Sequence, residues 1–152
     1  MTRKQLFLLA TMGSAALLLG AFAFQFIGGM APCHLCLLQR WPHAAAIVIG
    51  GLALAFGNRL LGYLGALVVL AGSGIALYHV GVEQKWWLGP TTCTSSGTEG
   101  LTTEQLMEQI MAAPLVRCDE IAWQMWHISM AGWNGLLSLG LVVIWIMAAR
   151  KA

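Results

Sequence analysis

Four long runs of apolar residues divide this chain, and one polar stretch separates the last two runs. The runs span Leu6–Ile27, Leu37–Phe56, Leu60–Val82 and Ile128–Ala149. A helix needs roughly 20 apolar residues to cross the hydrocarbon core of a bilayer, so each run is long enough to span a membrane. Arg40 is the only charged residue within them. The pattern predicts an all-α fold, an integral membrane four-helix bundle with one long loop.

Composition agrees with a membrane location. The chain has 152 residues, of which 59% are hydrophobic and 9% are charged, and its mean hydropathy is +0.75. A soluble domain usually carries about 25% charged residues, so most of this chain cannot face water. We expect a single membrane domain over residues 1–152. The net charge of +2 is too small and too scattered to indicate nucleic-acid binding, and the sequence contains no phosphate-binding loop or nucleotide fingerprint.

The polar stretch, roughly Glu83–His127, has a pattern of its own. Trp86 and Trp87 suit the aromatic belt at a membrane interface. Thr102 and Gln105 have the spacing of a capping box, which predicts a helix start. The residues that follow place one apolar stripe along a short helix that ends near Pro114, and the stripe consists of Leu106, Met107, Ile110 and Met111. We expect this short amphipathic helix to lie on the membrane surface.

Charge predicts the orientation of the bundle. Five of the eight Lys and Arg residues flank one predicted side of the membrane, namely Arg3, Lys4, Arg59, Arg150 and Lys151. All six acidic residues lie between the third and fourth runs. The positive-inside rule therefore predicts that both termini are cytoplasmic. In a bacterial inner membrane all four cysteines would then face the periplasm, where disulfides form and persist.

The N-terminal run also has features of a cleavable signal peptide. Arg3 and Lys4 precede it, and Ala21-Phe22-Ala23 resembles a cleavage site. Its apolar run exceeds the usual length of roughly 7–15 residues, however. We therefore expect a retained membrane anchor.

The cysteines form two sets. Cys33 and Cys36 make a Cys-x-x-Cys pair at the mouth of the second run, whereas Cys93 and Cys118 lie in the polar loop. At a helix N-terminus the dipole and free amides stabilise a thiolate, which favours redox chemistry. A structural disulfide remains an alternative for either pair, and half of a zinc site remains one for Cys33 and Cys36. A c-type haem site would need His after the second cysteine, where Leu37 stands.

Arg40 and two histidines are further candidates for the site. Arg40 lies one helical turn after Cys36 on the same face, and it would stabilise a thiolate or an anion on a bound acceptor, since an isolated charge within a membrane is costly. Pro42 either starts the regular helix or kinks one already begun, and the sequence leaves both open. His43 and His79 lie near the outer boundary, where either could be a satisfied interfacial histidine. His79 is also a candidate cofactor contact.

Five segments, in order along most of the chain, carry a resemblance to a known family. They are Pro32–Arg40, Tyr78–Glu83, Gly89–Cys93, Cys118–Asp119 and Ser129–Asn134. The first resembles the active-site segment of the DsbB family of membrane disulfide bond formation proteins, the next two its loop entry, and the last two its fourth helix. The ordered match is far more specific than a lone Cys-x-x-Cys motif.

The resemblance implies a membrane thiol:quinone oxidoreductase. Cys93 would form the mixed disulfide with a soluble, periplasmic, DsbA-type thioredoxin-fold oxidase. Cys118 would be the disulfide partner of Cys93 within the loop. Cys118 would then exchange with Cys33, freeing Cys36. A mobile loop would give the access that thiol–disulfide exchange requires.

The resemblance also implies an electron acceptor. The Cys36 thiolate would pass electrons to ubiquinone, or menaquinone, held near Arg40. Gln39 stands where some members of the family carry an acidic residue, so a carboxylate beside the arginine is not required here. The chain resembles the compact members of the family.

Three other interpretations remain. A vitamin K epoxide reductase-like quinone enzyme is also a small bundle with a Cys-x-x-Cys pair, but its redox pair should lie nearer the far end of the chain. A b-type cytochrome-like subunit could use His43, His79 or His127 as axial ligands. A structural membrane subunit would need the cysteines only as cross-links.

Overall fold

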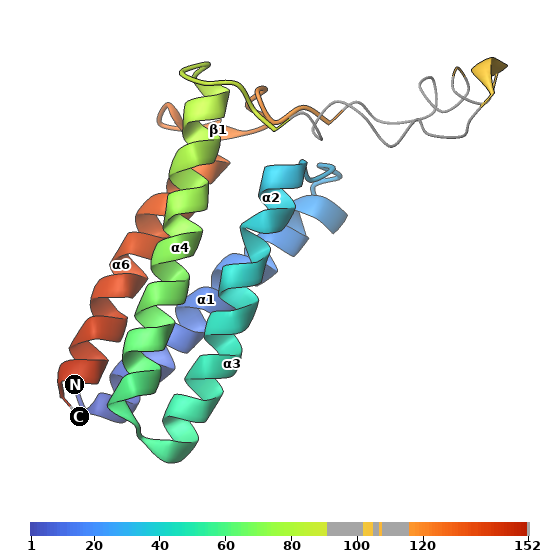
Figure 1. Cartoon of the computed structure of the whole chain (residues 1–152). Helices are drawn as coiled ribbons and strands as arrows, with labels where there is room; N and C mark the ends of the chain where they lie inside the picture. Colours follow the sequence, from blue (N-terminus) through green and yellow to red (C-terminus); the bar gives the residue numbers. More distant parts are fainter. Residues whose placement is uncertain (91–101, 105–106, 108–115, 152) are drawn as a thin grey trace.

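The computed structural model describes residues 1–90, 102–104, 107 and 116–151. Its helices are α1 (Arg3–Phe26), α2 (His34–Leu38), α3 (Arg40–Phe56), α4 (Arg59–Glu83) and α6 (Met130–Arg150) (Figure 1). When α2 and α3 are taken together, this part of the chain has four helices that are long and apolar enough to cross a membrane. The predicted four-helix membrane bundle is confirmed, with helix ends within a few residues of those expected.

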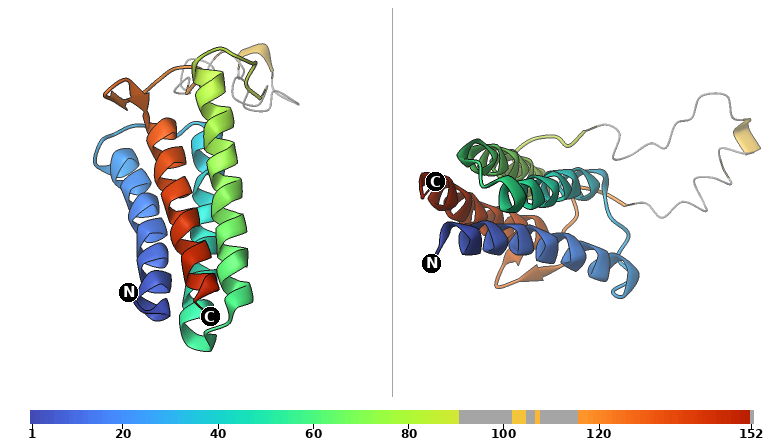
Figure 2. Two further views of the ribbon diagram at one scale, coloured as in Figure 1. Left: turned by 90° about the vertical axis from the view of Figure 1, so that its left-hand side faces the viewer. Right: turned by 90° about the horizontal axis from the view of Figure 1, so that it is seen from below.

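The long helices pack as a square of two layers (Figure 2). Helices α3 and α4 form one layer and α1 and α6 the other, and each helix contacts its neighbours in both layers. Both termini and the α3–α4 turn lie at one end of the bundle (Figure 1). The segments that flank the long loop lie at the opposite end. Because α1 packs against α3 and α6, it is part of the bundle. This is the position expected of a retained membrane anchor.

Side chains that cap the helices explain where the helices begin. Thr2 and Gln5 form a capping box at the start of α1. The side chain of Asn58 accepts a hydrogen bond from the amide of Leu60 at the start of α4. Gly57 ends α3 with φ of 63°, a left-handed conformation that glycine adopts without steric cost. The predicted tight turn between the second and third helices therefore follows from its residue types.

The half of the bundle near the termini is filled by close-packed apolar side chains. Phe7 of α1 and Trp145 of α6 are fully buried, and their ring centroids lie 5.7 Å apart. Gly65 of α4 lets Trp145 approach closely, since a Cβ there would lie 2.7 Å from the indole ring. Gly62 does the same for Ala149. Small residues at helix contacts let backbones approach within membranes, where packing drives association.

A short hairpin before the last helix corrects the prediction that this helix begins at Ile128. Strands β1 (Gln124–Met125) and β2 (Ile128–Ser129) pair antiparallel, and α6 begins only after Ser129, which caps it by accepting from the amide of Gly132. The two turn residues, Trp126 and His127, have φ of 52° and 62°. Positive φ at both central residues is the conformation of a type I′ turn. Neither residue type favours that conformation, so the sequence carries no turn signal there.

The second membrane segment is broken near its start. Helix α2 ends at Leu38 and α3 begins at Arg40, with Gln39 between them as the shared cap. Pro42 lies in the first turn of α3, where its missing amide costs little. Of the two readings of Pro42 that the sequence leaves open, the structure therefore favours the start of the regular helix.

The expected short amphipathic helix lies largely outside the described residues, and so does Cys93. Elsewhere large apolar side chains cover the outer faces of the bundle, as lipid contact requires. They include Leu19, Val48, Leu67, Leu77 and Val143.

Candidate functional site

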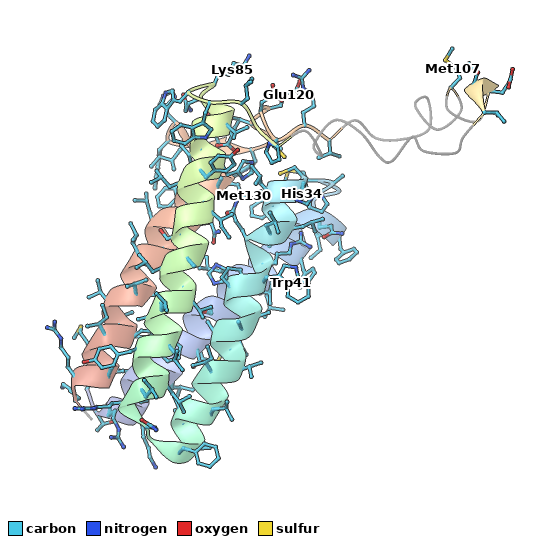
Figure 3. All side chains as sticks on the ribbon, in the orientation of Figure 1. His34, Trp41, Lys85, Met107, Glu120 and Met130 are labelled. Atoms are coloured by element: carbon cyan, nitrogen blue, oxygen red, sulfur yellow. The ribbon has the colours of Figure 1, made fainter. Side chains whose placement is uncertain are left out.

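The Cys-x-x-Cys pair lies at the end of the bundle opposite the termini, as the labelled His34 in Figure 3 indicates. Cys33 caps α2, because its sulfur accepts a hydrogen bond from the amide of Cys36 at 3.2 Å. The two sulfurs lie 2.8 Å apart, with Cys33 as donor and Cys36 as acceptor. Both are free thiols. A disulfide has a sulfur–sulfur distance of about 2.05 Å, so the two sulfurs need to move only a short way to form one when an acceptor takes two electrons and two protons.

The described loop cysteine packs against this pair. Cys118 is buried in one cluster with Cys33, Leu35 and Val82, and only 1% of its surface is exposed. Cys118 is disulfide-bonded. One free dithiol and one disulfide sulfur from distant parts of the sequence therefore share a single buried cluster.

Hydrogen bonding and burial suppress ionisation of Cys33. The hydrogen bond to Cys36 is the largest cause that raises the pKa of the Cys33 thiol, and burial adds to it. Cys33 is therefore the proton-bearing partner of the pair. The acceptor, Cys36, is half-buried and borders a cavity.

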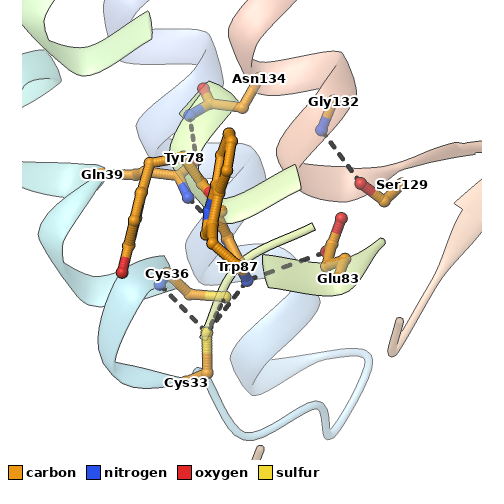
Figure 4. A network of polar contacts seen from close by, with 10 residues as sticks. Cys33, Cys36, Gln39, Tyr78, Glu83, Trp87, Ser129, Gly132 and Asn134 are labelled. Carbon is orange, nitrogen blue, oxygen red and sulfur yellow. Dashed lines mark hydrogen bonds and ion pairs between the residues drawn. The ribbon is translucent and has the colours of Figure 1, made fainter. Parts of the chain in front are cut away.

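His79 of α4 lies beside the dithiol. Its Nε2 is 3.6 Å from the sulfur of Cys33 and 3.8 Å from a carboxylate oxygen of Glu83. Its Nδ1 lies 2.8 Å from the side-chain nitrogen of Gln39. The side chains of His79 and Glu83 are about 4% and 5% exposed, so the group is shielded from water. Figure 4 shows Glu83 on the same side of the bundle end as the two cysteines.

The polar contacts continue away from the sulfurs into the bundle. The amide nitrogen of Asn134 donates to the side-chain oxygen of Gln39 at 2.6 Å. The side-chain oxygen of Asn134 lies 3.0 Å from Nε2 of His43. This network joins α3, α4 and α6 in addition to Gln39 at the break between α2 and α3. Figure 4 shows Gln39 and Asn134 within it.

Arg40 points toward α1 rather than toward an acidic partner. One of its terminal nitrogens donates to the side-chain oxygen of Gln25 at 2.7 Å, and the other lies 3.4 Å from the carbonyl of Ala21. The guanidinium carbon lies 4.8 Å from the ring centroid of Phe22, within range of a cation–π contact. Its Nε is buried and has no hydrogen-bond partner among the described residues.

These groups border one cavity of about 360 Å³ that opens between the helices. Its walls are mostly apolar, and its polar lining includes the side chains of Cys33, Cys36, Gln39, Arg40, His43, His79, Glu83 and Asn134. A volume of this size, with an apolar wall and a few convergent polar groups, is typical of a small-molecule site.

The structure gathers most of the residues that the sequence singled out. Cys33, Cys36, Arg40 and His79 all border the cavity, and Cys118 packs against Cys33. Cys93 lies outside the described residues.

Sequence reasoning assigned no role in the site to several polar residues that border the cavity. Gln25, Glu83 and Asn134 were not singled out, and Gln39 was noted only for lacking a carboxylate. His43 was considered only as an interfacial histidine or, in the alternative of a b-type cytochrome, as an axial ligand. The sequence did contain a signal for Gln25 and Asn134. A carboxamide within an apolar run must find a polar partner in the bundle, so both could have been predicted to face its interior.

The arrangement also resembles a partial metal site. The sulfurs of Cys33 and Cys36 and a ring nitrogen of His79 all lie within 4.8 Å of one another. Thiolate and imidazole are ligands that zinc prefers, although structural zinc sites use four of them.

Comparisons with known proteins identify the family of the chain. Residues 3–148 match the family described as Disulfide bond formation protein DsbB. Similar relatives, each called Disulfide bond formation protein B, occur in Azoarcus sp. (31% identical, covering 98% of this chain and 95% of that protein), Methylococcus capsulatus (32%, 89% and 87%) and Marinobacter nauticus (28%, 95% and 90%). No solved structure matches the chain significantly. The chain therefore belongs to the DsbB family, which makes it a multi-pass membrane oxidoreductase of disulfide bond formation.

Proposed function

We propose that this protein reoxidises a soluble DsbA-type dithiol oxidase and passes the electrons to ubiquinone, as a protein-dithiol:quinone oxidoreductase. One observation carries the proposal. The free thiols of Cys33 and Cys36 lie between a buried disulfide sulfur, that of Cys118, and a mostly apolar cavity bordered by Arg40, whose Nε is buried without a partner among the described residues.

The first half of the reaction exchanges disulfides. A thiolate of the partner attacks Cys93, forms a mixed disulfide with it and releases Cys118. Cys118 then attacks a Cys33–Cys36 disulfide at Cys33, and Cys36 leaves as the thiolate. The shared burial of Cys118 and Cys33 supports this step, because exchange requires the two sulfurs to meet.

Two further exchanges complete the transfer. The second thiol of the partner resolves its mixed disulfide and releases Cys93 as a thiol. Cys93 then attacks Cys118 in the Cys118–Cys33 disulfide. The Cys93–Cys118 disulfide forms again, and Cys33 and Cys36 are left as thiols. The described combination, free Cys33 and Cys36 with a bonded Cys118, corresponds to this last state. The partner has lost two electrons and two protons, and the protein now holds them.

The cavity fits a quinone ring. Its volume of about 360 Å³ and its apolar wall suit a lipid-soluble ring that enters between helices. The buried Nε of Arg40 has no partner among the described residues, and it would donate to an oxygen on the ring. When bound, the quinone accepts two electrons and two protons while the Cys33–Cys36 disulfide forms. Cys36, half-buried at the cavity wall, would deliver the electrons. His79, which also borders the cavity, is the second proposed cofactor contact.

The ends of the bundle support an orientation with cytoplasmic termini. Lys151 donates to the backbone carbonyl of Met1 at 2.9 Å, so the two ends of the chain lie together. All five cations that flank the predicted inner side lie at or near that end. Figure 3 shows Lys85, Glu120 and His34 at the other end, which would face the periplasm of a bacterium with an inner membrane.

Quinone reduction by the purified protein tests the proposal. A reduced DsbA-type protein serves as donor, ubiquinone as acceptor, and Cys36→Ser is run in parallel with the wild type. We expect turnover in the wild type and none in the variant, because serine cannot form the disulfide. Absence of turnover in the wild type with active quinone present would contradict the proposal.

A metal site is the second candidate, favoured by the convergence of Cys33, Cys36 and His79. It predicts stoichiometric zinc in the reduced protein purified without chelator. Elemental analysis of the wild type and of His79→Ala would measure it. Zinc retained by the wild type and lost from the variant would favour this candidate over the electron relay.

A further inference from the structure

A chain of hydrogen-bonded side chains leads from the dithiol to an unpaired, buried atom of a residue that borders the cavity. It runs from Cys33 through His79, Gln39 and Asn134 to His43. Figure 4 shows Cys33, Gln39 and Asn134 in this chain. His79, Gln39 and His43 are buried, with 3%, 6% and 3% of their surfaces exposed. Such a buried polar network is costly to leave incomplete, so its ends are informative.

The amide groups fix the direction of every bond in this chain. The oxygen of Asn134 can only accept, so Nε2 of His43 carries a proton and donates to it. The nitrogen of Asn134 donates to the oxygen of Gln39. The nitrogen of Gln39 then donates to Nδ1 of His79, which leaves the proton of His79 on Nε2, facing Cys33. All donors point toward the sulfur.

The same logic defines the far end. Because a neutral imidazole has one proton, Nδ1 of His43 is an acceptor with a free lone pair. That atom is buried and has no hydrogen-bond partner among the described residues. His43 also borders the cavity. A buried acceptor without a partner is destabilising, so a group that fills the cavity and donates a hydrogen bond there would be selected.

We propose that His43 is a ligand-binding residue that accepts, through Nδ1, a hydrogen bond from a hydroxyl group of the reduced acceptor, a hydroquinone. The inference rests on the proposed function, since it assigns a new residue to the same cavity. An oxidised ring offers only carbonyl oxygens, which accept, whereas the reduced ring offers hydroxyl donors. His43 therefore distinguishes the two forms, and Asn134 is the positioning residue that holds its proton on Nε2.

Separate measurement of the affinities for the two forms of the ring tests the inference. The protein carries Cys33→Ser and Cys36→Ser, so that no electrons move, and a short-chain ubiquinone and its ubiquinol are bound in turn without oxygen. Quenching of tryptophan fluorescence reports occupancy, because Trp123 and Trp133 border the cavity. Adding His43→Leu should weaken ubiquinol binding roughly 3- to 10-fold, the range expected for one hydrogen bond. Ubiquinone affinity should change less than about 2-fold, since His43 makes no bond to it.

Two conservative variants separate the two nitrogens of His43. His43→Asn retains an acceptor near the position of Nδ1 and should retain part of the preference for ubiquinol. His43→Gln retains a donor near Asn134 but lacks an acceptor at the Nδ1 position, and should lose the preference. His34→Leu is the matched control, because this exposed histidine does not border the cavity.

The outcomes are distinct. Equal loss of both ligands in His43→Leu, or no loss of ubiquinol, would overturn the inference while leaving the quinone function intact. If the parent protein bound neither ligand, the proposed function would fall, and the inference with it. Nitrogen NMR of labelled histidine in the parent protein gives a readout that needs no variant at His43. Nδ1 without a proton is expected, and a proton on Nδ1 would overturn the inference.

Discussion

The two ends of the bundle are built from the same helices but have different interiors. Near the termini, α4 and α6 meet through Gly65 and Trp145 with no room for an added carbon. Near the dithiol, His79 of α4 and Asn134 of α6 are both hydrogen-bonded to Gln39, and all three border a cavity. Close packing near the termini holds the helices together, whereas the end near the dithiol contains a cavity with polar side chains on its wall. The comparison predicts that substitutions at one end change stability and those at the other change chemistry.

Loss of a sulfur should have the largest effect on activity. It should not change the packing at the end of the bundle near the termini. Cys33→Ser keeps an acceptor that can cap α2, because serine is a good N-cap residue. We therefore expect an unfolding midpoint near that of the wild type. Quinone reduction should fall by about a thousand-fold or more, as expected when an obligatory covalent step is removed. Steady-state turnover with a DsbA-type donor, beside thermal unfolding in detergent, measures both. A large drop in stability with substantial activity retained would contradict the division between the ends.

Removal of the buried cation should have the next largest effect. Arg40→Leu deletes the hydrogen bond to Gln25 and the unpaired Nε at the cavity. A bond to a charged group contributes about 1.5–3 kcal/mol, so we expect the KM for ubiquinone to rise roughly 10- to 100-fold. Formation of the mixed disulfide with the partner should be unchanged, because Arg40 does not contact the loop residues that the structure describes. Arg40→Lys keeps the charge without the Nε and should be intermediate. Equal loss of partner exchange and quinone use would count against this role of Arg40.

An added methyl group at the close-packed end near the termini should have the opposite result, with lower stability and unchanged activity. In Gly65→Ala the new Cβ would lie 2.7 Å from the ring of Trp145, and overpacking of this kind costs about 1–3 kcal/mol. Gly74→Ala is the matched control on the same helix, because no atom lies within 4 Å of its added Cβ. Alanine is the better helix former by about 1 kcal/mol, so the control should be unchanged or slightly stabilised. Equilibrium unfolding in detergent compares the two, and equal stabilities would show that the close packing is unimportant. Quinone turnover of both folded variants should match the wild type.

Much of the fold could be predicted from the sequence, because long apolar runs have one stable form in a bilayer. The hairpin at Trp126 and His127 could not, since tertiary contacts impose positive φ on residues that carry no turn signal. The site was predicted unevenly for a related reason. Cys33 and Cys36 are neighbours in sequence, and their spacing alone indicates their chemistry. Asn134, which lies 95 positions after Gln39, reaches it only when the helices have packed.

The smallest expected effect concerns the proton on Cys33. Its hydrogen bond to Cys36 and its burial raise the pKa of the thiol, so the proton is retained to higher pH than in an ordinary cysteine, whose pKa is about 8.5. In reduced protein, alkylation of Cys33 by iodoacetamide should therefore require more alkaline solution, because only the thiolate reacts. Cys36→Ala removes the first cause and leaves burial, so the midpoint should move down in pH without reaching that of a free thiol. Mass spectrometry of the modified peptide across pH measures the shift. A wild-type midpoint at or below that of a free thiol would mean that Cys33 donates no proton to Cys36, and the polarity of the pair would have to be reversed.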